Sequence, residues 1–319
     1  MCHEVISMKT RILKSAAVLV LVCVLALSLT GCDKLSYRKA INLYNAGKYD
    51  AAAKRFGDLG DYENSADLLT RSQYWAAITV MEEGNFQEAL TRFTDLGDYE
   101  DSQQRVAECT YQIAVEAFEA GSFTDAETHF QKIPGYRQTL EYMRRINWQR
   151  VFDAVAAAGP EDTGSVTLQK VKVGKVYRIT ADTADPNQLI FHVYSMKNMG
   201  YNFYDAFTLT LTRDSKEAAF TSTSTFTMEM NGTQIGSQQA ASGTVDISTC
   251  TPETILQPDT FEKTVTDNHG KTTRSTDPAD STMNDTMTEN LNALMTVIPE
   301  LLLDAGIEVT LADLGFTAM

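Results

Sequence analysis

Two nearly identical acidic octapeptides are the residues most suggestive of chemistry. Residues 58–65 read DLGDYENS and residues 95–102 read DLGDYEDS. Clustered carboxylate and amide oxygens are calcium ligands, so a metal site is one interpretation. A calcium loop, however, needs ligands at alternating positions and a central glycine, which these octapeptides lack. A third copy, KIPGYRQT at residues 132–139, loses the acids. We therefore predict a structural role and no metal site.

The three copies keep the residue types of a turn that precedes a helix. Each has an apolar residue, a small residue or proline, a tyrosine and a final hydroxyl residue. Asp61 with Asn64, and Asp98 with Asp101, have the spacing at which side chains at a helix start can satisfy backbone N–H groups. We predict that these residues form turns and helix caps.

Histidines and catalytic motifs give little support for an enzyme. The histidines beyond residue 31 are His129, His192 and His269, far apart in the chain. The sequence has no HExxH, no CxxC pair, no glycine-rich phosphate loop and no Gly-x-Ser-x-Gly. We predict a protein that is not an enzyme and that binds no cofactor. An enzyme with an unrecognised site stays open as an alternative.

Cys32 follows a segment that has the features of an export signal. Lys9, Arg11 and Lys14 precede an apolar run over residues 16–29. The run has roughly 15 residues, fewer than the ~20 that a membrane-spanning helix needs, and its basic flank is typical of a signal peptide. Met8 is a better start than Met1, because the basic region follows it directly.

The residues Leu29, Thr30, Gly31 and Cys32 resemble the lipobox of bacterial lipoproteins. That resemblance implies a diacylglyceryl group on the Cys32 thiol, cleavage after Gly31, a signal peptide over 1–31 and a short lipidated tether over 32–36. It implies attachment to the cell membrane on the extracytoplasmic face, which two acyl chains make durable. The alternative is an ordinary signal peptide that ends at a chance cysteine.

The charge of the processed chain excludes nucleic acid as a partner. Without residues 1–31, the chain has 24 Lys and Arg against 41 Asp and Glu. Proteins that bind phosphate backbones attract them with a basic face, so we predict no nucleic-acid binding.

Cys109 and Cys250 are the cysteines left besides Cys32. Isolated buried thiols are favoured over a single disulfide between distant segments.

A repeat of 37 residues occupies the first half of the processed chain. Its copies are residues 37–73, 74–110 and 111–147, and the first two are identical at 14 of 37 positions. Six positions are the same in all three copies: Tyr37, Tyr74 and Tyr111; Ala40, Ala77 and Ala114; Gly47, Gly84 and Gly121; Ala52, Ala89 and Ala126; Phe56, Phe93 and Phe130; Tyr62, Tyr99 and Tyr136. Such a period predicts stacked units, here of two helices separated at the glycine.

The spacing of Ala, Gly, Ala and Phe within each copy resembles the tetratricopeptide repeat, although the period is 37 rather than 34 and the usual proline is absent. The resemblance implies a helical superhelix whose inner face binds peptide segments of a partner. We predict another envelope protein as that partner and Tyr37, Tyr74 and Tyr111 as contacts. Packing between helices is the alternative role of these tyrosines.

The remaining elements complete an α+β multidomain chain. A helix from residue 139 to 158 is predicted to cap the stack, so the repeat domain covers 37–158 and a linker covers 159–165. Alternation over 166–319 predicts six to eight strands in an antiparallel meander. Apolar residues at steps of three and four between 283 and 302 predict a helix that covers the sheet.

We therefore predict a noncatalytic scaffold or binding module in the cell envelope, of an oligomeric state that the sequence does not determine. A carrier of a hydrophobic or lipid ligand is the alternative. A curved sheet closed by a helix could enclose an apolar cavity, an arrangement that resembles lipid-carrying lipoproteins at the level of fold class.

Overall fold

The computed structural model describes residues 33–158, 166–181, 185–251, 254–276 and 281–316. The chain divides into two compact units, with the boundary between Thr139 and Leu140. The first is helical and the second contains an antiparallel sheet, which confirms the predicted mixed α+β class. Cys32 and the lipobox residues before it lie outside the described residues. Within the described ranges, no helix is long and apolar enough to cross a membrane.

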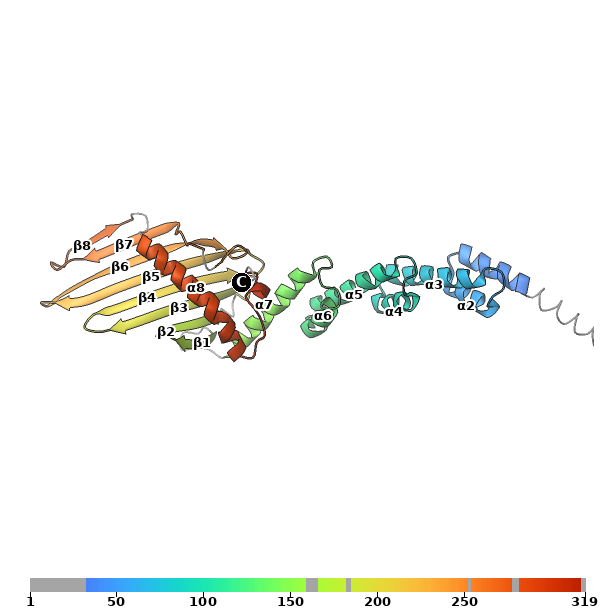
Figure 1. Cartoon of the computed structure of the whole chain (residues 1–319), viewed down its shortest axis with the longest axis horizontal. Helices are drawn as coiled ribbons and strands as arrows, with labels where there is room; N and C mark the ends of the chain where they lie inside the picture. The colour runs from blue at the N-terminus through green and yellow to red at the C-terminus, as the bar shows by residue number, and fades with distance from the viewer. Residues whose placement is uncertain (1–32, 159–165, 182–184, 252–253, 277–280, 317–319) are drawn as a thin grey trace, which may run out of the picture. The chain divides into compact units, whose positions relative to one another are not determined.

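Short helices that pack consecutively along the chain form the first unit (Figure 1). Residues 33–45 are helical, and the helices that follow are α2 (Tyr49–Leu59), α3 (Ser65–Glu82), α4 (Phe86–Leu96), α5 (Ser102–Glu119) and α6 (Phe123–Phe130). Gly47, Gly84 and Gly121 follow helices and have φ of +72°, +83° and +76°. The left-handed conformation is one that glycine adopts without strain, which explains why the repeat keeps it there.

The positions that all copies share form the same core three times. The repeated alanines and phenylalanines are fully buried. In the second copy, the Tyr74 ring lies edge-on to Phe93 at 6.1 Å and to Tyr99 at 5.7 Å, measured between ring centroids. Tyr37 and Tyr111 make the corresponding pairs in their copies. Sequence identity between the copies therefore reflects packing.

The octapeptides form the turns before α3 and α5, but their polar residues do not cap these helices. Neither Asn64 nor Asp101 makes a side-chain bond to the helix start. Each instead accepts a hydrogen bond from the repeated tyrosine 27 residues earlier, Tyr37 to Asn64 and Tyr74 to Asp101. In the third copy, Tyr111 donates to Gln138 at 2.9 Å. The predicted cap is wrong, because the tertiary partner satisfies these acceptors.

An eight-stranded antiparallel meander forms the sheet of the second unit, in the order β1 to β8. Its strands are β1 (Val166–Lys172), β2 (Lys175–Ala181), β3 (Gln188–Asn198), β4 (Asn202–Thr212), β5 (Glu217–Met230), β6 (Thr233–Asp246), β7 (Thr260–Thr266) and β8 (Thr272–Ser275). Tight turns join β5 to β6 at Asn231–Gly232 and β7 to β8 before Lys271. Both Asn231 and Gly232 have positive φ, as a tight two-residue hairpin requires.

One face of the sheet is apolar and the other is rich in threonine. Phe191, Phe207 and Phe220 point to the buried face, and Thr208 lies beside Thr221 on the opposite one. Helix α8 (Ser281–Asp304) crosses the buried face (Figure 1). The predicted stripe of α8 is at most 4% exposed: Met283, Met287, Leu291, Leu294, Met295, Ile298, Leu301 and Leu302. A short 3-10 helix, η1 (Ala312–Leu314), follows.

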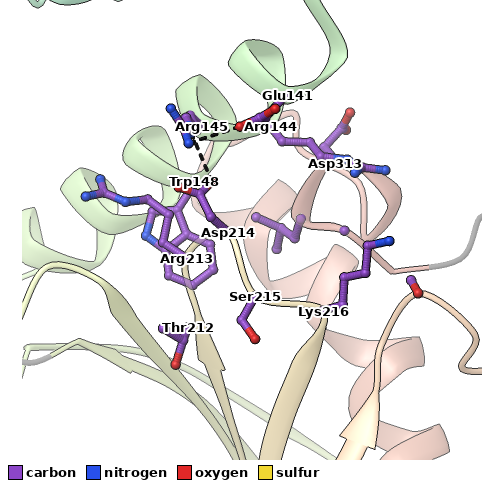
Figure 2. A pocket seen from close by; sticks show the side chains of 13 residues that line it. Glu141, Arg144, Arg145, Trp148, Thr212, Arg213, Asp214, Ser215, Lys216 and Asp313 are labelled. Atoms are coloured by element: carbon purple, nitrogen blue, oxygen red, sulfur yellow. Dashed lines mark hydrogen bonds and ion pairs between the residues drawn. The ribbon is translucent and has the colours of Figure 1, made fainter. Parts of the chain in front are cut away.

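Helix α7 (Thr139–Ala157), which we expected to cap the stack, packs in the second unit instead. Trp148, Val151, Phe152 and Val155 are buried in one cluster with the sheet and α8. The Arg145 guanidinium bonds to Asp214 in the turn after β4, at 3.0 Å (Figure 2). The unit boundary therefore lies at the start of α7 rather than after it.

A buried polar pair joins α8 to the sheet. Asp205 of β4 and Asn290 of α8 are both buried. Asn290 Nδ2 donates to Asp205 Oδ2 at 3.0 Å, and Lys175 Nζ donates to Asn290 Oδ1 at 2.8 Å. Asp205 Oδ1 has no hydrogen-bond partner among the described residues. Burial raises the pKa of the Asp205 carboxyl above its usual range.

Replacing Asp205 by asparagine should stabilise the protein at neutral pH. The pKa of Asp205 is higher in the folded than in the unfolded state. The stability that the protonated Asp205 carboxyl gives the folded state is therefore fully present at pH values below its pKa in the unfolded chain. This stability is lost as the pH rises through its pKa in the folded protein. Asparagine keeps an acceptor for Asn290 and carries no charge. We expect the free energy of unfolding, from urea denaturation, to rise at neutral pH, by about 1 kcal/mol as for removal of an unpaired buried charge, and to match the parent at acid pH, where the carboxyl is protonated. Lower stability of the variant at neutral pH would contradict this.

Candidate protein-binding surface

The three tyrosines predicted to contact a partner lie between helices. Their rings pack on the repeated phenylalanine and on the tyrosine of the octapeptide, and their hydroxyls donate to the residue 27 positions later. Tyr111 is only 6% exposed, while Tyr37 and Tyr74 are half-buried. This geometry favours the packing role that the sequence left as an alternative. It leaves the tyrosines little surface for a partner.

The helical unit instead exposes a tryptophan on α3. Trp75 is 38% exposed. Its ring stacks on Tyr49 at 6.1 Å between centroids, with 26° between the ring planes. Tyr49 meets Tyr44 edge-on at 5.5 Å, and the Arg71 guanidinium lies 5.8 Å from the Tyr44 centroid. We call Tyr44, Tyr49, Arg71 and Trp75 the Trp75 surface. It offers aromatic area and a cation, which are enriched at the energetic centres of protein interfaces.

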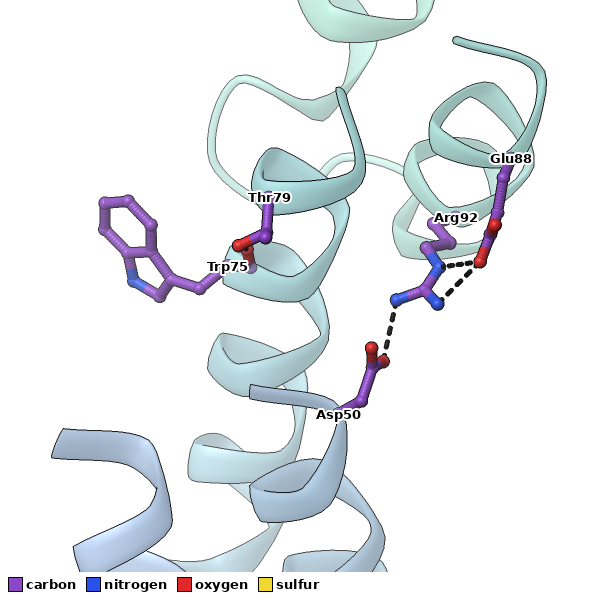
Figure 3. Close-up of polar contacts among 5 residues, drawn as sticks. All are labelled: Asp50, Trp75, Thr79, Glu88 and Arg92. Atoms are coloured by element: carbon purple, nitrogen blue, oxygen red, sulfur yellow. Dashed lines mark hydrogen bonds and ion pairs between the residues drawn. The ribbon is translucent and has the colours of Figure 1, made fainter. Parts of the chain in front are cut away.

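A surface hollow of about 310 Å³ adjoins the Trp75 surface. It is lined by Tyr49 and the residues on either side of it at the start of α2, together with Ala76 and Thr79 of α3. Thr79 Oγ1 donates its proton to the Trp75 carbonyl at 3.0 Å, so the hydroxyl oxygen can still accept hydrogen bonds; Figure 3 labels both residues. Tyr49 thus belongs both to the aromatic stack and to the wall of the hollow.

An ion-pair network fixes the start of α2 beside this hollow. Arg92 of α4 bonds to Asp50 at 2.7 Å and to Glu88 at 2.7 Å (Figure 3). Arg92 is about one-third exposed and Asp50 is well exposed. Exposed pairs of this kind contribute at most about 1 kcal/mol each to stability. They connect the start of α2, whose Asp50 also lines the hollow, to α4.

Trp75 is a residue that the repeat does not require. The equivalent positions in the first and third copies hold Arg38 and Gln112. Tyr49, by contrast, corresponds to Phe86 and Phe123, and Phe123 meets Phe118 as Tyr49 meets Tyr44. The aromatic pair of Tyr44 and Tyr49 therefore belongs to the packing that the repeat copies share, whereas Trp75 occurs in the second copy alone. The repeat pattern does not predict it, because Trp75 is not among the residues that the copies share.

In the second unit, His192 lies within the sheet. His192 of β3 lies between Thr180, 2.7 Å from Nε2, and Thr208, 3.4 Å from Nδ1. Burial lowers the pKa of His192 to about 4, so its ring is neutral at physiological pH. Over the described ranges, no group of three or more His, Cys, Asp or Glu side chains is placed to hold a metal ion.

Both cysteines of the described chain are free and buried. Burial raises the pKa of the Cys109 thiol to about 11 and also raises that of Cys250. Because the thiolate is the reactive form, neither cysteine is suited to redox chemistry.

The stripe of α8, which would line the cavity of a ligand carrier, belongs to one buried cluster with the inward side chains of the sheet.

Comparison with protein families, with curated proteins and with solved structures finds no match to this chain.

Proposed function

We propose that this protein is a noncatalytic scaffold of the bacterial cell envelope, held to the extracytoplasmic face of the cell membrane by a diacylglyceryl group on Cys32. Its helical unit is a tetratricopeptide-like stack, and the Trp75 surface binds a segment of another envelope protein. The exposed Trp75 supports this proposal most directly, because the repeat that surrounds it does not require an aromatic residue there.

The chemistry of the Trp75 surface indicates what the bound segment contains. The Trp75 and Tyr49 rings offer a flat apolar area, and the hollow beside them can take one side chain. A segment with an apolar or aromatic anchor is therefore expected. Arg71, which lies over the Tyr44 ring, favours an acidic residue next to that anchor.

Replacing Trp75 by alanine should abolish most partner binding. Truncation of a central aromatic residue in an interface costs at least about 2 kcal/mol, which corresponds to roughly 30-fold in affinity. Proximity crosslinking in cells, followed by identification of the crosslinked protein, measures this as the loss of one partner from the recovered set.

Tyr201→Ala is the matched control, because Tyr201 is 37% exposed but belongs to the sheet unit. We expect Tyr201→Ala to retain the partner. If Trp75→Ala retained the partner and Tyr201→Ala lost it, the binding surface would belong to the sheet unit and the proposal for the helical unit would be wrong.

A further inference from the structure

A cleft of about 370 Å³ opens in the second unit, at the end of the sheet where β4 turns into β5. It is lined by α7, by residues 212–216 of the turn, by Ser248 after β6 and by residues 313–315 near η1 (Figure 2). The buried Trp148 indole forms part of its wall, held by a bond from Nε1 to the Pro186 carbonyl at 3.4 Å. Its volume falls within the range of small-molecule sites.

Acids in the cleft already have partners. Glu141 and Asp214 both pair with Arg145, at 3.0 Å each. Asp313 Oδ2 accepts two hydrogen bonds from Thr310, from the backbone N–H at 2.8 Å and from the hydroxyl at 2.6 Å. These contacts use the carboxylates to hold the turn and η1 in place. Glu141 and Asp214 are therefore paired with a cation, whereas Asp313 keeps its full negative charge.

The residues that line the cleft include more cations than acids. The side chains of two of these cations make neither an ion pair nor a hydrogen bond with another residue of the described part of the chain. Arg144, Arg145, Arg213 and Lys216 face three carboxylates. Arg213 donates to a neutral amide, Asn187 Oδ1, at 2.5 Å. Within the described part of the chain, the side chains of Arg144 and Lys216 make no ion pair or hydrogen bond, although the charge of Lys216 contributes to lowering the pKa of the exposed Asp246 carboxyl. Arg144 belongs to α7 and Lys216 to the turn between β4 and β5, and Figure 2 labels both among the residues that line the cleft.

We propose that this cleft binds a small organic anion, whose carboxylate or phosphate group is held by Arg144 and Lys216. An excess of positive charge is unusual on a chain with a net charge of −15, and a cleft concentrates its effect on an anionic ligand. Arginine and lysine differ in their donors, and together they match an oxyanion: Arg144 offers a planar fork and Lys216 a point charge. The Trp148 wall packs on the remainder of the ligand.

The chain provides its own reporter for this site, because Trp75 and Trp148 are its two tryptophans. In a full-length Trp75→Phe chain, the tryptophan fluorescence, excited selectively over that of tyrosine, comes from Trp148 in the cleft. Titration with inorganic phosphate and, separately, with acetate should give a saturable change with at least one of them. The anion that binds more tightly identifies the recognised group. Binding should weaken with added salt.

Arg144→Gln and Lys216→Gln, each made in the Trp75→Phe chain, should weaken binding about 10-fold, the order expected for one charged hydrogen bond. Lys271→Gln removes the same charge from the β7–β8 turn, at the opposite end of the sheet, and should leave binding unchanged. No saturable change with either anion, or equal weakening in all three variants, would overturn the proposal.

Discussion

A fragment that begins at residue 159 should fail to fold, whereas a fragment that begins at residue 139 should unfold cooperatively. The longer fragment contains α7, whose Trp148, Val151, Phe152 and Val155 lie in the core of the sheet unit. Burying each such side chain stabilises the fold by about 1.5–3 kcal/mol, and four together reach the order of a whole domain's stability. Urea denaturation, followed by circular dichroism, compares the two fragments.

Point variants of the full chain test the packing of α7 without cutting the chain. They show whether the fragment fails to fold because it lacks the α7 core residues or because it was truncated. Val151→Asp places an unpaired charge in the core and should lower the urea midpoint of the sheet unit sharply. Leu140→Asp introduces the same residue on the same helix at a position that is 62% exposed, and should have little effect. If the fragment from residue 159 unfolded at the same urea concentration as the longer one, α7 would not belong to the sheet unit.

The repeat and the sheet could be predicted because local patterns determine them. The 37-residue repeat keeps Ala77, Gly84 and Phe93, and this pattern predicts one helix that ends at the glycine and a second helix after it. The prediction does not require knowing which surfaces these helices pack against. Alternation over Leu189, Phe191 and Val193 predicts a strand in the same way. The stripe of α8 is periodic enough to predict both the helix and its buried face.

The partner of α7 could not be predicted, because an apolar stripe at helical spacing fits a helix stack and a sheet equally well. The tyrosine acceptors were also missed, although a signal existed. Asn64, Asp101 and Gln138 occupy one repeat position and all carry a side-chain acceptor. Local reasoning assigns Asn64 and Asp101 to caps, because Asn and Asp favour helix starts.

Sequence reasoning could not find the cleft for a different reason. Its residues come from four segments that are far apart in the chain, and no short motif joins Arg144 to Lys216. Their significance depends on which of the neighbouring acids already have partners. Arg145 forms ion pairs with Glu141 and Asp214, and only the three-dimensional structure shows these pairings.

Replacing Cys32 by serine should move the protein from the membrane fraction to the soluble fraction. In the proposed form, two acyl chains on the Cys32 thiol each contribute about 0.8 kcal/mol per buried methylene, which makes attachment durable. Serine offers no thiol to acylate, and the acidic processed chain does not hold itself at an anionic surface. Cell fractionation with immunoblotting measures the distribution. Cys109→Ala is the control, because that thiol is buried and should not carry lipid, so its variant should stay with the membrane. A Cys32→Ser protein that still sediments with membranes would show that something other than the lipid holds it there.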